Sequence, residues 1–388
     1  MAGYPNPLTR AWLDAAIQAR PTKAALKQQY IGSEYFPLRP VQDYELTWDV
    51  IGSGNRMAGI YAHDGVPVPG DDYDYSQKMA DVVNVMASRV VDNKTVMVLR
   101  DAGEPAVENN ATLKSVRQRH LDKLAEKVAN ADDEVDAVME YMALQALQGS
   151  ITWPPLSATG IPIVNPPASW GGVSFTLSMG FRANFIQNIS TLAGWNARAG
   201  GGLAWTNNAS NPVLDLEVIA ELMQETTGMS MMGATAIMSR SVLSRLAFNT
   251  TVLTWVRGTI GPAGGNLNFI DVGELKNFIT TKLGWNIRIY DSIWTYPSNL
   301  GGAGGPTENH VKFLPEGKMI VIPKGALEGN AFFATAPDPG SDNSWNTGKY
   351  TWVYRMPTPP WTTEIGVGLH GFAVLKSARE IACFDVYA

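Results

Sequence analysis

One long amphipathic helix is the feature of this sequence that most limits its fold. Between residues 115 and 148, apolar side chains recur at alternating spacings of three and four, which predicts one face of an α-helix. They are Leu121, Leu124, Val128, Ala131, Val135, Val138 and Met142, and Gly149 stands where a helix stop is expected. At ~1.5 Å per residue this helix is ~50 Å long, too long for the interior of a small domain. A coiled-coil segment is one interpretation, and a helix along the edge of a domain is the one that we favour.

The opposite face of this helix is polar. It carries Arg117, Arg119, Lys123, Glu126, Lys127, Asp132, Asp133, Glu134 and Glu140. A solvated face is the ordinary explanation for such a pattern. We therefore expect neighbouring carboxylates such as Asp132 and Asp133 to be exposed rather than catalytic.

The chain is poor in charge. Only 17% of its residues are charged, against a typical ~25%, although its hydrophobic fraction of 45% is ordinary. This combination indicates that neighbouring molecules cover much of the surface. Residues 151–214 contain only two charged side chains, Arg182 and Arg198, and we expect them to form a sheet interior or a subunit interface. The formal net charge of −6 argues against a dedicated nucleic-acid-binding protein.

Two segments lack the means to fold alone. Residues 1–36 hold two short helical patterns, each below the ~12–15 residues that an isolated helix needs in water. Residues 56–92 form an excursion longer than compact domains normally carry, and its extended run at 82–91 needs a covering surface. We expect both segments to contact neighbouring subunits, through Trp12, Ile17, Val82, Val85 and Met86.

The rest of the chain mixes helical and extended patterns without a regular βαβ rhythm. Extended runs are predicted at 41–51, 285–290, 319–322, 331–336, 350–355 and 371–387, the last with a break. Helices are predicted from Pro212 onward, over 239–252 and over 271–283, with Asn211 as an N-cap and Gly284 as a stop. The fold class is therefore α+β.

No pattern typical of catalysis, of a cofactor or of a metal is present. Gly52 and Gly54 follow a predicted strand, but Met57 stands where a dinucleotide loop needs its third glycine. The four histidines are dispersed, and the single cysteine, Cys383, excludes an intramolecular disulfide or a zinc ribbon. No signal peptide or apolar run of membrane-spanning length is found, so we expect a soluble chain made inside the cell that is not an enzyme.

Several short motifs resemble those of tailed-phage major capsid proteins, specifically the lambda-like capsid protein E family with the Hong Kong 97-type fold. They are Tyr35-Phe-Pro, Arg100-Asp-Ala-Gly-Glu104, Glu140 to Gly149, Trp205 with Asn211-Pro212 and Asp215-Leu216, Ile237-Met-Ser239, and Phe313 to Pro323. They follow the family's order with similar spacing. The chain departs from the family pattern around 155–200 and in a longer loop at 296–310.

The resemblance implies an order of parts along the chain. An N-terminal arm and first strand (1–55) precede an extended loop (56–92), a peripheral domain (93–216) with the spine helix, an axial domain (217–345) and return strands of the peripheral domain (346–388). The implied function is that of a structural major capsid protein, which assembles as pentamers and hexamers into an icosahedral head around double-stranded DNA.

The resemblance also implies the partners. They are other copies of the chain, portal, scaffold and decoration or cement proteins, and packaged DNA that is contacted weakly and non-specifically. No cofactor, metal or membrane is implied, and the chain would be a virion component assembled in the host cytoplasm. Lys78 is expected near the tip of the extended loop, where one phage of this fold class has a crosslinking lysine, although a solvated lysine is the ordinary explanation.

Two other classes stay open on the residues alone. One is a non-catalytic shell protein of a compartment. The other is a carbohydrate-binding or hydrolytic β protein, suggested by the twelve tryptophans. The latter would need a signal peptide or paired acids on adjacent strand ends, and neither is seen.

Overall fold

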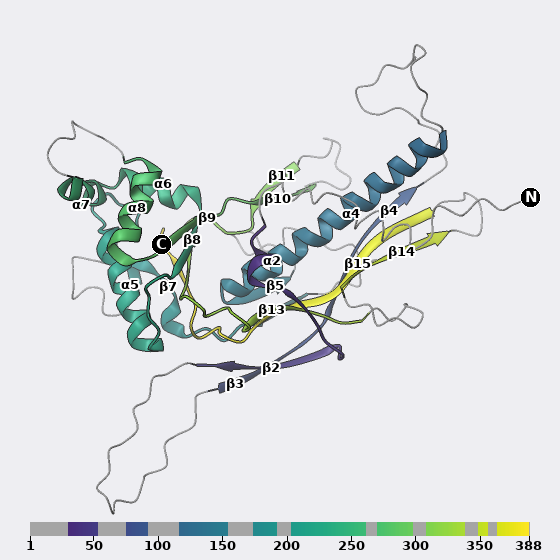
Figure 1. The fold of residues 1–388 in the computed structure, drawn as a ribbon, viewed down its shortest axis with the longest axis horizontal. Coiled ribbons are helices and arrows are strands. Elements are labelled where there is room, and N and C mark those ends of the chain that lie inside the picture. The colour runs from purple at the N-terminus through teal and green to yellow at the C-terminus, as the bar shows by residue number, and fades with distance from the viewer. Residues whose placement is uncertain are drawn as a thin grey trace, which may run out of the picture.

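A computed structural model shows two apolar cores joined side by side (Figure 1). The structure describes residues 30–52, 75–91, 116–153, 174–191, 203–260, 270–297, 308–337, 348–355 and 363–387. Helices and strands are mixed without a regular alternation, as an α+β fold requires.

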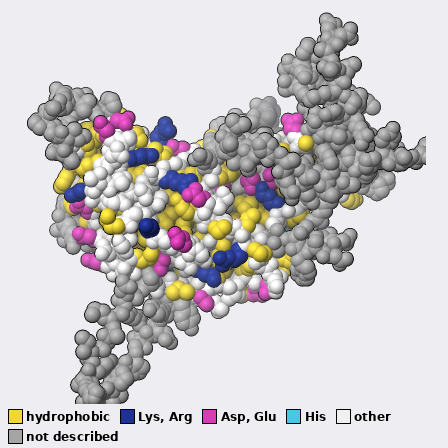
Figure 2. All heavy atoms as spheres, in the orientation of Figure 1, with side chains coloured by type: hydrophobic (Ala, Val, Ile, Leu, Met, Phe, Trp, Pro, Cys, Tyr) yellow, Lys and Arg dark blue, Asp and Glu magenta, His cyan; other side chains and the backbone are white. Residues whose placement is uncertain are grey.

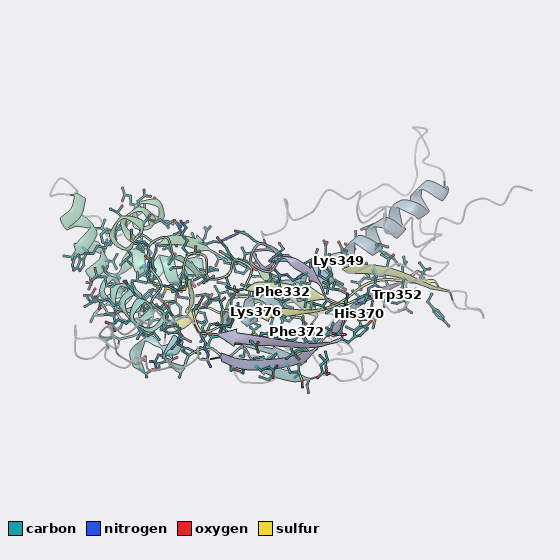
Figure 3. The ribbon with its side chains drawn as sticks, turned by 60° about the horizontal axis from the view of Figure 1, so that its bottom comes forward. Phe332, Lys349, Trp352, His370, Phe372 and Lys376 are labelled. Carbon is teal, nitrogen blue, oxygen red and sulfur yellow. The ribbon has the colours of Figure 1, made fainter. Side chains whose placement is uncertain are left out.

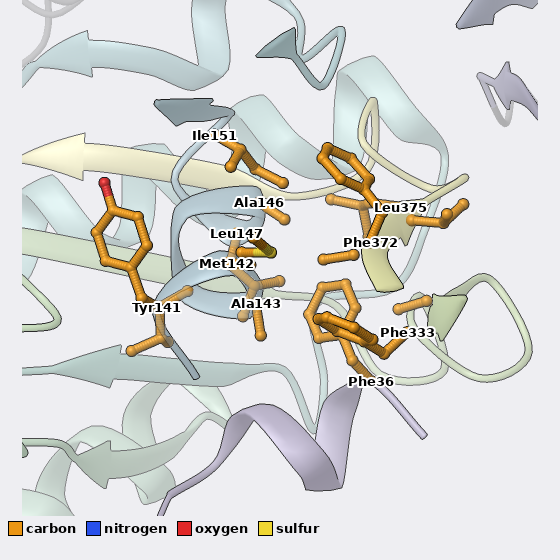
Figure 4. Close-up of a cluster of buried hydrophobic side chains, with 14 of the residues drawn as sticks. Phe36, Tyr141, Met142, Ala143, Ala146, Leu147, Ile151, Phe333, Phe372 and Leu375 are labelled. Carbon is orange, nitrogen blue, oxygen red and sulfur yellow. The ribbon is translucent and has the colours of Figure 1, made fainter. Parts of the chain in front are cut away.

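The first core lies between the long helix α4 (Val116–Leu147) and a five-stranded sheet. Its strands are β1 (Leu38–Pro40), β13 (Ala331–Thr335), β15 (Thr363–Leu375), β14 (Lys349–Arg355) and β4 (Val83–Val91). β4 and β14 pair with the two sides of β15. Figure 4 shows Met142 and Leu147 of α4 beside Phe333 of the sheet. The predicted helix at 115–148 is thus confirmed, and it packs along the sheet as a domain-edge helix.

A hairpin of β2 (Glu45–Ile51) and β3 (Tyr75–Asp81) is attached to this core. Its side chains alternate strictly along β2, because successive residues of a strand point to opposite faces. Leu46, Trp48 and Val50 are buried, and the Trp48 ring lies 6.4 Å from that of Phe372. The predicted strand at 41–51 is therefore seated on the subunit's own core.

The second core contains another five-stranded sheet and four helices. Its strands run in the order β7 (Ile186–Asn188), β16 (Ala382–Asp385), β12 (Lys318–Ile322), β8 (Thr235–Met238) and β9 (Asn286–Ile289). The helices are α5 (Pro212–Thr227), α6 (Arg240–Phe248), α7 (Thr250–Ile260) and α8 (Val272–Leu283), which gather at one end of the molecule (Figure 1). Trp205 and Trp285 are buried in this core.

The remaining elements are short. They are α2 (Gly32–Tyr35), the 3-10 turns η3 (Ala183–Phe185) and η4 (Ile189–Thr191), the pair β5 (Ser150–Trp153) and β6 (Phe175–Ser178), and the pair β10 (Ile293–Pro297) and β11 (Glu308–Lys312).

The predicted helix ends follow from capping residues, with one exception. Asp271 Oδ2 accepts the Gly273 amide at 2.8 Å, and Gly284 ends α8 with a left-handed φ of 72°. The single helix predicted over 239–252 is wrong, because the chain breaks at Asn249. The Asn249 side chain accepts the amides of Thr251 and Val252 at 2.9 and 3.2 Å, which starts α7 as a new helix.

Four strands lie elsewhere than the expected domain boundaries place them. β4 belongs to the first sheet rather than to a loop over 56–92, and β13 pairs with β15 although it falls within 217–345. β7 and β16 pair in the second sheet although they fall within 93–216 and 346–388. The chain crosses between the two sheets after β12 and again after β15, so a linear division cannot separate the cores. The division into peripheral and axial domains otherwise stays a prediction.

Candidate subunit-contact surfaces

The described residues hold no grouping that suggests metal or nucleophilic chemistry. In the described ranges, no three His, Cys, Asp or Glu side chains lie together in a way that could hold a metal ion. Cys383 is buried in β16, and burial raises the pKa of its thiol to about 12, which leaves it neutral and a poor nucleophile. Of the helices that are described, none has the length and apolarity to cross a membrane. The exposed surfaces of the two cores are therefore the candidate functional features.

Two aspartates of α4 bind the lysine that begins β14. Lys349 Nζ lies 2.6 Å from Asp132 Oδ1 and 2.6 Å from Asp136 Oδ1. Burial lowers the pKa of Lys349, but the two carboxylates outweigh it and the net change is upward. Asp132 was expected to be solvated; it is instead ion-paired and 16% exposed. The interaction ties the spine helix to one edge of the sheet.

The other edge of the sheet is tied to the same helix. Arg89 of β4 donates to Glu134, and Lys127 Nζ donates to the carbonyl of Val90 at 2.7 Å. Arg89 of β4 and Lys349 of β14 lie on the same face of the sheet, and each forms an ion pair with α4. The helix therefore covers that face across β14, β15 and β4.

Three expected contact residues of the extended run, Val82, Val85 and Met86, differ in how far the subunit itself buries them. Val85 is 8% exposed and belongs to the first core, so the expectation that it needs a neighbour's cover is wrong. The Val85 side chain points toward α4, because Val85 pairs with Leu369 on the sheet face that this helix covers. Val82 is half-buried against the same core, and Met86 points away with 58% exposed. Trp12 and Ile17 lie outside the described residues, and contact with another subunit stays a prediction for these two, for Val82 and for Met86.

The sheet face that points away from α4 carries exposed apolar side chains. We call it the outer sheet face and define it by Asn84, Met86, Ser88 and Val90 of β4, Glu364, Gly366, Gly368 and His370 of β15, and Tyr350, Trp352 and Tyr354 of β14. Met86, Val90 and Tyr354 are between 54% and 58% exposed. Exposed apolar groups of this size on one face are typical of a protein–protein contact surface.

Glycines let aromatic rings lie flat on this face. A Cβ on Gly366 would lie 2.7 Å from Trp352 Nε1, and a Cβ on Gly368 would lie 2.6 Å from the Tyr350 hydroxyl. The Tyr350 ring in turn stacks on His370, with centroids 5.0 Å apart. Figure 3 labels Lys349, Trp352 and His370 in this part of the molecule. The rings thus form a preformed surface rather than flexible protrusions.

A second set of exposed apolar side chains lies on the second core, which contains helices α5 to α8 and which we call the helical core. Met232, Phe248 and Trp255 are 68%, 60% and 44% exposed. Lys282 lies 5.2 Å from the Trp255 ring centroid, a cation–π geometry. No periodic pattern in the sequence predicts this set, because Met232 lies in a turn, Phe248 on α6 and Trp255 on α7.

Lys78 lies in β3, opposite Trp48 of β2, rather than at the tip of a loop. Its Cε would stand 3.1 Å from a Cβ on Gly180. The prediction for Lys78 stays a solvated lysine, with a crosslink as the alternative. The motif at 100–104 and residues 56–74 lie outside the described residues.

Comparison with known proteins gives a family match over part of the chain and a fold over its length. A family model described as phage major capsid protein E matches residues 9–165. None of the curated protein sequences matches the chain. Among solved structures, a capsid protein of a prophage of E. coli CFT073 covers 97% of this chain with 99% of its own, at 12% identity and a TM-score of 0.57.

Two further solved structures are similar over the whole length with lower scores. A phage-related protein from Bordetella bronchiseptica RB50 covers 100% of this chain with 98% of its own, at 14% identity and a TM-score of 0.45. An encapsulin from Synechococcus elongatus PCC 7942 covers 96% with 94% of its own, at 11% identity and a TM-score of 0.40. The family match over residues 9–165 spans less than half of the chain, whereas along its length the chain has the fold of a phage capsid protein, the Hong Kong 97-type.

Proposed function

We propose that this protein is the major capsid protein of a phage, a structural subunit that assembles with copies of itself into the shell of the head. The observation that carries the proposal is the fold shared with the prophage capsid protein over 97% of this chain. The family match over residues 9–165 supports it independently, since it rests on sequence rather than on shape. Pentamers and hexamers closing into an icosahedral shell are the expected arrangement.

The exposed apolar side chains give this assembly a physical basis. Burying a side chain such as Met86 or Tyr354 at an interface is worth about 1.5–3 kcal/mol, and many copies multiply the gain. The outer sheet face and the exposed residues of the helical core are the surfaces that neighbours would cover. Because the chain's charge fraction is only 17%, little desolvation of charge opposes such burial.

Assembly of the full chain into particles, with variants of the outer sheet face, tests the proposal. We expect the unchanged chain to sediment as particles and the double variant Met86→Ser/Tyr354→Ser to sediment mainly as small species. Met79→Ser is the matched control, because Met79 is 61% exposed on β3 and lies off the outer sheet face. A 42.1 kDa monomer that never assembles would overturn the proposal.

Contact with packaged double-stranded DNA is proposed to be weak and salt-screened. In Figure 2 the lysines and arginines of the face shown are spread among acidic side chains rather than gathered in one patch. The net charge of −6 supports the same inference, because tight binding needs clustered cations that release counterions. Tight duplex binding by the isolated protein at physiological salt would contradict it.

The remaining parts of the proposal are partners and place. Portal, scaffold and decoration proteins are the expected partners, the virion is the expected location, and assembly is expected in the host cytoplasm. We propose no catalytic role. The same assembly experiment separates a sugar-binding protein, which would stay monomeric with sugar-dependent tryptophan fluorescence. A compartment shell would also form particles, and the nucleic-acid content of particles taken from producing cells separates it, because a compartment shell would enclose no DNA.

A further inference from the structure

A buried carboxylate joins three parts of the subunit that are far apart in sequence. Glu140 lies in α4, one of the residues expected on its solvated face, yet it is 2% exposed. Its Oε1 accepts the Ile31 amide at 3.0 Å and the Tyr290 hydroxyl at 2.6 Å, and its Oε2 accepts the Gly32 amide at 2.6 Å. Ile31 and Gly32 begin α2, and Tyr290 directly follows β9 of the second sheet.

The segment that Glu140 holds cannot keep its conformation alone. α2 has four residues, and its first amides have no partner within so short a helix. The carboxylate supplies those partners. The Glu34, Tyr35 and Phe36 amides bond back to the carbonyls of Ile31 and Gly32, so the whole turn depends on the two amides that Glu140 fixes.

Gly32 is matched to this carboxylate. It lies in the helical turn, so its backbone conformation does not by itself require glycine. A Cβ there would collide with Glu140 Oε2 and lie 2.9 Å from the Cβ of Ala143. Only a glycine lets the turn approach α4 closely enough for both bonds.

The other contacts of this segment are weaker or less directional. Glu34 pairs with Arg288 of β9 at 2.6 Å, but Glu34 is 58% exposed, and such pairs contribute little. Tyr30 packs edge-on against Phe313 with centroids 5.6 Å apart. Ile31 and Phe36 are buried in the first core. Burial holds these two side chains, whereas the directed bonds to Glu140 fix the backbone of the turn.

We propose that Glu140 is a latch: it holds residues 31–36 against both cores, and its loss detaches this segment while the cores stay folded. The segment lies just before β1, so the latch also fixes the position of the first described residues of the chain. This inference concerns the single subunit and holds whether or not the chain builds a shell.

Hydrogen–deuterium exchange of the full chain, read by peptide mass spectrometry, tests the latch. In Glu140→Ala we expect exchange over residues 31–36 to rise at least about tenfold, because two buried amides and one hydroxyl lose their acceptor. Peptides from β15 and α8 should change less than about twofold. Glu134→Ala is the matched control, since it removes a carboxylate of the same helix that pairs with Arg89.

Two results would overturn the proposal. One is unchanged exchange over residues 31–36 in Glu140→Ala, and the other is an equal rise along the whole chain, which would make Glu140 a general core residue. Should that variant fail to fold, Tyr290→Phe removes one donor and leaves the carboxylate. It should raise exchange in the same segment by a smaller factor, and no change there would equally count against the latch.

Discussion

At the residue scale, the glycines of β15 decide whether the outer sheet face can form. Gly366 and Gly368 face the Trp352 and Tyr350 rings at distances that leave no room for a Cβ. Such glycines lose more backbone entropy on folding than other residues, but they let an aromatic side chain pack closely against the strand. Sequence alone does not reveal this pairing, because it depends on the register between β14 and β15.

Gly366→Ala should therefore destabilise the subunit. The added methyl displaces the half-buried Trp352 ring, and overpacking of this kind costs about 1–3 kcal/mol. Urea unfolding followed by circular dichroism measures the change. Ser88→Ala, at the paired position on β4, is the control and should leave stability within about 0.5 kcal/mol. Equal stability of Gly366→Ala and the unchanged chain would show that Trp352 can shift freely.

Lys349→Met should also destabilise the subunit, and the effect should depend on pH. The variant keeps the apolar stem but leaves Asp132 and Asp136 without their cation, at a cost of about 2 kcal/mol near neutral pH, between the values for exposed and buried pairs. Arg89→Met, which removes an exposed pair with Glu134, is the control and should cost about 0.5 kcal/mol.

The sign of the pH effect follows from the pKa changes. The raised pKa of Lys349 means that its contribution is present below the ordinary lysine pKa and is lost only as pH rises through the raised value. Burial raises the pKa of Asp136, and removing Lys349 raises it further. The variant's deficit should thus be largest near neutral pH and shrink as the pH falls toward the ordinary aspartate pKa. A deficit that grows on acidification would contradict this account.

At the element scale, sequence predicts elements better than their partners. The spacing of apolar residues predicted α4, and Gly284 predicted the end of α8. Glu140 shows where the approach fails, because a carboxylate on the polar side of a helix signals solvent unless the residues that donate to it are known. Those donors come from residues 31, 32 and 290, and nothing local connects them.

The extended loop and the N-terminal arm are still predicted to hold neighbouring subunits together. A deletion that tests this must spare β3, because its partner β2 buries Trp48 and Val50. A deletion of 66–78, for example, would remove part of β3. Deleting 56–73 spares both strands. We expect a folded subunit with near-native circular dichroism that forms no stable shells; unfolding of the subunit would instead assign the deleted residues to its own core.

At the scale of the whole molecule, the two cores share one chain that crosses between them. β13 and β15 belong to the first sheet, whereas β12 and β16, which lie next to them in sequence, belong to the second. The motif order along the chain indicated the fold, but the crossing points could not be derived from it. Local patterns specify strands, and long-range pairing decides which sheet each strand joins.

The central claim is that many copies of this chain build a closed shell. Electron micrographs of particles purified from cells that express the full chain test it most directly. The account predicts closed shells of uniform diameter, in which the outer sheet face and the exposed residues of the helical core lie at subunit contacts. Soluble monomers, or irregular aggregates without a defined diameter, under conditions in which the subunit is folded would contradict it.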